Sequence, residues 1–150
     1  MSERFKPQNN YYIVEFQFAK WLRMDGFDEP CRAYYDSYKL AGGLPVFLTR
    51  PVKNSLYKGT FIAAPTIWEV ERYFRDRYHI DINTITAYTG VERVTNISYY
   101  PVISAPSGFG KLGIKRLDEE DTKVFGSKEE ALYHALKIVM NFVAIHKDNL

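Results

Sequence analysis

Apolar residues at helical spacing predict a first helix near the start of the chain. In "VEFQFAKWLRMDGF" (residues 14–27), Phe18, Trp21 and Leu22 fall on one helix face. Gly26 follows them, and glycine is the residue type that most often ends a helix. We therefore expect a helix that stops at this glycine.

Two capping boxes predict where two further helices begin. Thr66 precedes Glu69 by three residues, and Ser127 precedes Glu130 by the same spacing. In this arrangement the two side chains accept hydrogen bonds from free backbone N–H groups at the helix start. The apolar stripes that follow are Ile67, Val70, Phe74 and Tyr78 in one helix and Leu132, Leu136, Val139 and Val143 in the other. We expect the last helix, which runs to about residue 145, to cover a sheet.

Alternating apolar and polar residues predict strands between these two helices. The stretches "IDINTITAY" and "VTNISYYPVIS" are rich in β-branched residues and indicate strands near 82–88 and 96–104. Thr89 and Gly90 would join them, and "APSGF" would turn the second strand back into a third at 110–117. The expected result is an antiparallel meander.

Shorter strands are predicted between the first two helices. The segments 44–49 and 56–63 alternate, and they are split by the turn signals Arg50-Pro51 and Asn54-Ser55. Together these patterns predict an α+β fold: a single domain over residues 1–150, with an antiparallel sheet (meander or hairpin) covered by about three helices. Residues 1–10 are expected to form a flexible N-terminus.

The stretch "SAPSGFGKLGIKR" (residues 104–116) contains the pair Gly110-Lys111 of a P-loop, and a G-x-G-x-x-G pattern that starts at Gly108. A P-loop needs a hydroxyl side chain after the lysine and a helix behind it. Leu112 has no hydroxyl, and a strand pattern follows instead of a helix. We interpret the stretch as a hairpin loop and expect no nucleotide cofactor.

Composition and charge narrow the classes of function. The hydrophobic share of 46% and charged share of 25% are those of an ordinary globular protein. A net charge of +2, from 20 basic and 18 acidic residues, gives no strong attraction to nucleic acids or anionic membranes. The 12 tyrosines and 10 phenylalanines suit half-buried sheet faces and contact surfaces.

Candidate catalytic and metal-binding residues are few. The three histidines are widely separated, and Cys31 is the single cysteine, so we predict no metal site and no catalytic residue. Cys31 is interpreted as a small buried hydrophobic residue, with a nucleophile paired to a distant histidine as the alternative. The acidic run at 118–121 is interpreted as a solvated turn.

The same single cysteine, together with an opening stretch "MSERFKPQNN" that lacks the apolar segment of a signal peptide, predicts a cytoplasmic protein. No apolar run approaches the length that spans a bilayer.

Three stretches carry a resemblance to known proteins: "FQFAKWLRMDGFDEPC", "APTIWEVERYFRDRYHI" and "FGSKEEALYHALKIVMNF". Together with the tyrosine-rich strand region, they resemble a group of small uncharacterised bacterial proteins associated with prophages and other mobile elements. The resemblance spans most of the chain. It implies a compact α+β accessory protein and brings no catalytic or binding residue with it.

Two functions follow as hypotheses. The preferred one is a non-catalytic interaction protein whose exposed aromatic residues contact a partner protein or a second copy of the chain. The alternative is a single-strand nucleic-acid binder in which Tyr57, Tyr99 and Tyr100 stack on bases. Its basic contacts would be Arg50, Lys53, Lys58, Lys111, Lys115 and Arg116. Strand alternation weakens this alternative, because it sends Tyr99 and Tyr100 to opposite faces of the sheet.

Overall fold

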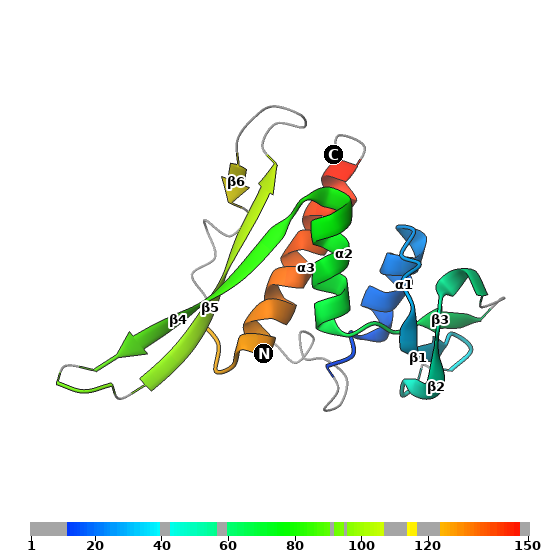
Figure 1. The fold of residues 1–150 in the computed structure, drawn as a ribbon, viewed down its shortest axis with the longest axis horizontal. Coiled ribbons are helices and arrows are strands. Elements are labelled where there is room, and N and C mark those ends of the chain that lie inside the picture. Colours follow the sequence, from blue (N-terminus) through cyan, green and yellow to red (C-terminus); the bar gives the residue numbers. More distant parts are fainter. Residues whose placement is uncertain are drawn as a thin grey trace. The chain divides into compact units, whose positions relative to one another are not determined.

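The computed structural model describes residues 12–39, 43–56, 60–90, 92–94, 96–106, 114–116 and 124–147, with the backbone alone at 106 and 114–116. The helices of this part are three α-helices and one short 3₁₀ helix, and its strands form two three-stranded antiparallel sheets (Figure 1). This is the α+β fold that the sequence predicts, with two sheets in place of one.

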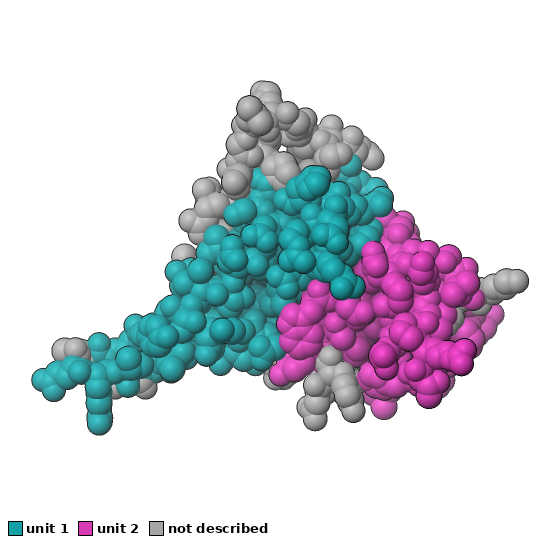
Figure 2. Space-filling view, viewed as in Figure 1, with its two compact units in different colours: residues 1–5, 71–150 teal, residues 6–70 magenta. Residues whose placement is uncertain are grey.

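The described residues fall into two compact units, residues 12–70 and residues 71–147 (Figure 2). Assignment of the whole chain to a single domain stays a prediction. The expected flexible N-terminus at 1–10 lies outside the described residues.

The unit at residues 12–70 is a small sheet with a helix before it. Its elements are α1 (Phe16–Met24), β1 (Cys31–Asp36), β2 (Val46–Val52), the 3₁₀ helix η3 (Asn54–Leu56) and β3 (Phe61–Ala63). The strand order is β2-β1-β3, so β1 is central, although it is not among the strands predicted from the sequence. Tyr35 of β1 is fully buried, and its hydroxyl donates to the Val14 carbonyl at 2.6 Å. Burial raises the pKa of Tyr35 well above its usual range.

The helix α1 ends as predicted. Gly26 has a φ of +97°, a conformation that glycine adopts without strain. Its N–H donates to the Arg23 carbonyl at 3.1 Å, and the N–H of Phe27 reaches back to the Leu22 carbonyl at 2.9 Å. These bonds satisfy carbonyls that the helix end leaves free.

The predicted break at Arg50-Pro51 is wrong, because β2 continues through both residues to Val52. The pairing between β2 and β1 is nevertheless irregular at this place. The register between β1 and β2 shifts between Cys31, which pairs with Val52, and Ala33, which pairs with Phe47. β2 therefore carries extra residues opposite Arg32. Proline has no N–H to donate to a strand ladder, which accounts for a disturbance at this point.

The second predicted turn, Asn54-Ser55, links the residues after α1 to β3. The Asn54 side chain is buried; its Nδ2 donates to the Phe27 carbonyl at 2.8 Å, and its Oδ1 accepts from the Ala63 N–H at 2.8 Å. Beside it, the N–H of Ser55 donates to Asp28 Oδ1 at 2.7 Å, and this hydrogen bond lowers the pKa of Asp28. The predicted strand start at residue 56 is wrong, since Leu56 belongs to η3 and β3 begins at Phe61.

The helix α2 (Ile67–Tyr78) continues from the first unit into the second. Its capping box forms as predicted: the Thr66 N–H donates to Glu69 Oε1 at 2.8 Å, and the Glu69 N–H donates to Thr66 Oγ1 at 3.3 Å. The predicted stripe is buried along its whole length.

The unit at residues 71–147 contains β4 (Asp81–Thr89), β5 (Asn96–Pro106), β6 (Ile114–Arg116) and α3 (Lys128–His146). The strands are antiparallel in the order β4-β5-β6, which confirms the predicted meander. The Ser127 hydroxyl accepts from the Glu130 N–H at 3.1 Å and so caps α3 as expected.

The helix α3 packs along β4 and β5 (Figure 1), so the prediction that it covers a sheet is confirmed. Its stripe Leu132, Leu136, Val139 and Val143 is buried. On the sheet, Ile82 of β4 lies opposite Ile103 of β5, and both are buried. These two strands and α3 form the core of the unit.

Glu71 at the start of this unit gives a pH-dependent prediction. Burial raises the pKa of Glu71 above its ordinary value of 4.5; Arg75 opposes this shift and Asp81 adds to it. Ionisation is thus disfavoured in the folded protein, and stability is lost as the pH rises from 4.5 through the folded-state pKa. We expect Glu71→Gln to raise the free energy of unfolding at pH 7, by no more than about 0.5 kcal/mol because Glu71 is partly solvated.

Urea denaturation at pH 7 and at about pH 3 checks this expectation, because below both pKa values Glu71 is protonated in the folded and the unfolded chain and the gain should disappear. A gain of equal size at both pH values would contradict it.

Candidate interaction surface on the β4–β5 hairpin

The strand β4 forms an outer edge of its sheet. Its nine residues pair with β5 in one unbroken antiparallel ladder, from Asp81 opposite Ser104 to Thr89 opposite Asn96. Among the described residues, no strand pairs with the other side of β4. This side therefore presents backbone N–H and C=O groups that can pair with a further strand. We call it the β4 edge, residues 81–89.

The β4 edge lacks the features that keep outer strands from pairing. Such strands are commonly short or bulged, or they carry lysine or proline. In "DINTITAYT" the only charged residue is Asp81, and there is no lysine, arginine, proline or glycine. The ladder to β5 has no register shift, so β4 is regular along its length. A second strand can approach it without meeting a steric or electrostatic obstacle on the strand itself.

Apolar side chains on the hairpin flank this edge. Figure 1 shows that the distal part of the hairpin extends past the N-terminal end of α3. There Tyr88, which is 65% exposed, lies opposite Ile97, which is 46% exposed. On the other face of the sheet, Ile85 lies opposite Tyr100 and is 38% exposed. Both faces therefore offer apolar contacts beside the outer side of β4.

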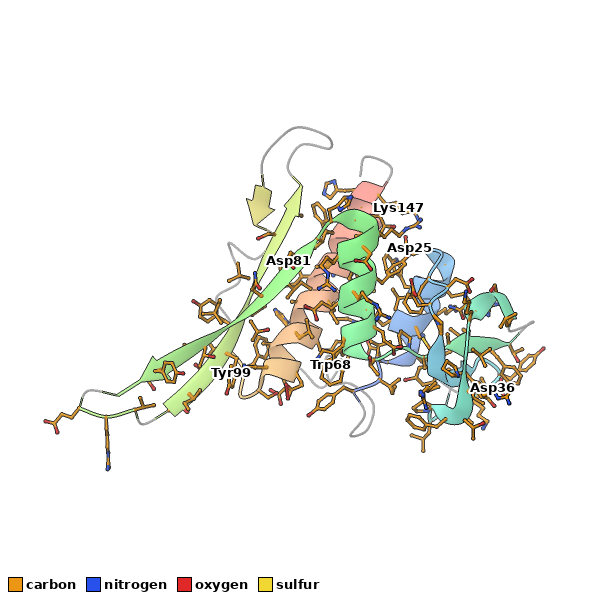
Figure 3. All side chains as sticks on the ribbon, viewed as in Figure 1. Asp25, Asp36, Trp68, Asp81, Tyr99 and Lys147 are labelled. Atoms are coloured by element: carbon orange, nitrogen blue, oxygen red, sulfur yellow. The ribbon has the colours of Figure 1, made fainter. Side chains whose placement is uncertain are left out.

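The two neighbouring tyrosines of β5 project to opposite faces, as predicted, because Tyr99 pairs with Thr86 and Tyr100 with Ile85 in a continuous ladder. The backbone of Tyr99 is also paired with Phe125, through hydrogen bonds of 2.8 and 2.7 Å. Figure 3 shows Tyr99 near the beginning of α3. Its side chain is half-buried and therefore offers only part of its ring to a base.

The basic residues of the nucleic-acid hypothesis are distributed over both units. Arg50 in β2 and Lys53 just after it are exposed. Lys115 and Arg116 are in β6, where the structure describes the backbone alone. Tyr57, Lys58 and Lys111 lie outside the described residues. The glycine-rich loop around Lys111 and the acidic run at 118–121 lie outside them as well, so both interpretations stay predictions.

Cys31 and His134 are part of the packing. Cys31 is completely buried at the start of β1, as its interpretation as a small hydrophobic residue requires, and its thiol donates to the Glu29 carbonyl at 3.5 Å. His134 is buried with its ring 4.9 Å from that of Phe125. In the part of the chain that the structure describes, no group of three histidine, cysteine or acidic side chains could hold a metal ion.

No helix in the described part of the chain is both long and apolar enough to cross a bilayer.

Sequence reasoning identified β4 as a strand but did not identify it as the outer one. Its composition gives no signal of an outer position, because nine residues with one charge and no proline or glycine are unusual for an outer strand.

Comparisons of the chain with protein-family models, with curated proteins and with solved structures find no match.

Proposed function

We propose that this chain is a non-catalytic cytoplasmic accessory protein that acts through protein–protein interaction, in the mobile-element setting that its sequence resemblance implies. The observation that carries the proposal is the unprotected β4 edge, flanked by exposed Ile85, Tyr88 and Ile97. An edge of this kind recognises an extended strand, because main-chain hydrogen bonds supply affinity and the alternating side chains supply specificity.

A second copy of the chain carries a strand that fits this edge. Two copies of β4 can pair antiparallel about a two-fold axis at Ile85, and two-fold dimers are the commonest symmetric assemblies. In that register Asp81 of each copy lies opposite Thr89 of the other, so no like charges meet. Thr84 lies opposite Thr86, a pair that stabilises antiparallel sheets. The two sheets would join into one of six strands.

The same register gives the exposed tyrosine an apolar partner. Tyr88 of each copy would lie beside Ile82 of the other, on the sheet face that α3 covers. Tyrosine and β-branched residues form favourable cross-strand pairs. The pairing thus covers the most exposed large apolar side chain of the hairpin strands, and it does so twice in a dimer.

Single-strand nucleic-acid binding remains the second candidate. Exposed Arg50 and Lys53 lie close together in sequence and favour it locally. The net charge of +2 and the opposite orientations of Tyr99 and Tyr100 weigh against it, since such binding needs several phosphate contacts and stacked bases on one surface.

Analytical ultracentrifugation of the full chain tests the preferred proposal. We expect a reversible dimer for the wild type and a monomer for Ile85→Lys, because the substitution places two lysines directly opposite each other at the axis. The dimer dissociation constant should rise by at least about ten-fold, which corresponds to roughly 1.4 kcal/mol. Ile85 is partly exposed, so the variant should remain folded.

Met24→Lys is the matched control, since it adds the same charge at a side chain that is 77% exposed on α1, and it should leave the dimer unchanged. Dimerisation should also depend little on salt, whereas nucleic-acid binding would weaken steeply with it. A wild-type monomer that binds labelled single-stranded oligonucleotides tightly in fluorescence anisotropy would reverse the order of the two candidates.

A further inference from the structure

A cavity of about 420 Å³ lies within the unit at residues 12–70, separate from the β4 edge. Its volume is within the range of small-molecule sites. The lining residues come from the segment before α1, from β1 and the residue before it, from β2, from the junction of β3 with α2 and from the first turn of α2. They are Ile13, Pro30, Arg32, Ala33, Phe47, Pro51, Ala64, Thr66 and Glu69.

The register shift between β1 and β2 borders this cavity. Phe47 and Pro51 lie at the two ends of the extra segment of β2, and Arg32 and Ala33 lie opposite it on β1. All four line the cavity. Irregularities of this type redirect side chains and occur frequently beside binding sites. The interrupted pairing therefore leaves a space where a regular ladder would place side chains in contact.

Hydrogen bonds fix the backbone on the opposite wall. Ile13 and Thr66 form an antiparallel bridge, with the Val14 N–H bonded to the Pro65 carbonyl and the Ile67 N–H to the Tyr12 carbonyl, both at 3.0 Å. This backbone is already ordered, so a ligand that binds against it loses less free energy to the ordering of the protein chain.

Three of the nine lining residues are polar or charged, and the side chains of two of them already form hydrogen bonds. Thr66 and Glu69 hydrogen-bond each other's backbone N–H groups in the capping box of α2. Arg32 is exposed, and in the part of the chain that the structure describes its side chain forms no hydrogen bond or ion pair. An apolar cavity thus has one guanidinium group available at its wall.

We propose that this cavity binds a small molecule with an apolar body and a carboxylate group. The body packs on Ile13, Phe47 and Pro51, and the carboxylate accepts hydrogen bonds from the guanidinium of Arg32. Arginine suits this role because its planar group can donate two parallel hydrogen bonds to one carboxylate. The proposal does not depend on pairing through the β4 edge.

An NMR titration of the full chain with octanoate, octylamine and octanol tests it. Octanoate should bind saturably and shift the backbone amide signals of Ala33 and Thr66, and octylamine and octanol should bind more weakly. Because hydrogen bonds to charged groups contribute about 1.5–3 kcal/mol, Arg32→Gln should weaken octanoate binding by roughly 10- to 100-fold. Arg32→Lys, which keeps the charge but loses the paired donors, should weaken it less.

Arg72→Gln is the control, because it removes an equal charge from an exposed residue of α2 that does not line the cavity. Phe47→Ala should also weaken octanoate binding, since it removes part of the apolar wall; thermal unfolding verifies that each variant is folded. The proposal is overturned if Arg32→Gln binds octanoate as the wild type does, if octylamine binds more tightly, or if octanoate fails to bind at millimolar concentrations.

Discussion

Phe74→Ala is expected to lower the free energy of unfolding by about 3–5 kcal/mol, the usual cost of removing a fully buried phenylalanine. Phe74 has no exposed surface, and its ring contacts those of Tyr73 and Tyr78 at centroid distances of 5.9 and 6.5 Å. Alanine is a better helix former than phenylalanine, so the loss comes from the cavity and the lost ring contacts and not from α2 itself. Urea denaturation followed by circular dichroism measures the change.

Trp68→Ala on the same helix is the matched control. Trp68 is larger than Phe74, but it is 48% exposed, and its ring contacts that of Tyr12 at a centroid distance of 5.4 Å. Its removal should cost only about 1 kcal/mol. If the two variants lost equal stability, burial would not be what makes Phe74 important.

Asn54→Ala is expected to lower the free energy of unfolding by about 2–5 kcal/mol, because it leaves two buried backbone groups without their hydrogen-bond partners. One is the carbonyl of Phe27, and the other is the N–H of Ala63. Both residues are only 1% exposed, so water cannot readily replace the side-chain amide. The substitution would disconnect the end of α1 from β3. Thermal or urea unfolding of the variant checks the size of the loss.

Asn83→Ala controls for the loss of an asparagine as such. Asn83 is exposed on β4, and its Nδ2 donates to Asp81 Oδ2 at 3.3 Å, where water can take over. We expect its effect to stay within about 0.5 kcal/mol. A loss at Asn54 no greater than this would mean that the buried amide is not a structural link.

The elements that have a local cause could be predicted from the amino-acid sequence. The capping box at Thr66 and Glu69 and the Ser127 cap of α3 form between residues three positions apart, and the apolar stripes of α2 and α3 follow from helical period alone. Gly26 ends α1 because its backbone conformation suits glycine, and alternation located β4 and β5. These interactions join neighbours in the chain, so a single sequence contains all the information they need.

Tertiary structure alone decided which strands meet and which stay open. Cys31–Asp36 is a strand because β2 and β3 pair with it on both sides. β2 can continue through Pro51, which has no N–H to donate, because Pro51 lies where the pairing with β1 is irregular. Likewise, nothing local distinguishes an outer strand from an inner one, so the β4 edge and the cavity beside Arg32 emerged only from the fold. Both depend on contacts between residues far apart in sequence, whose choice rests on the packing of the whole unit and not on the pattern of any one segment.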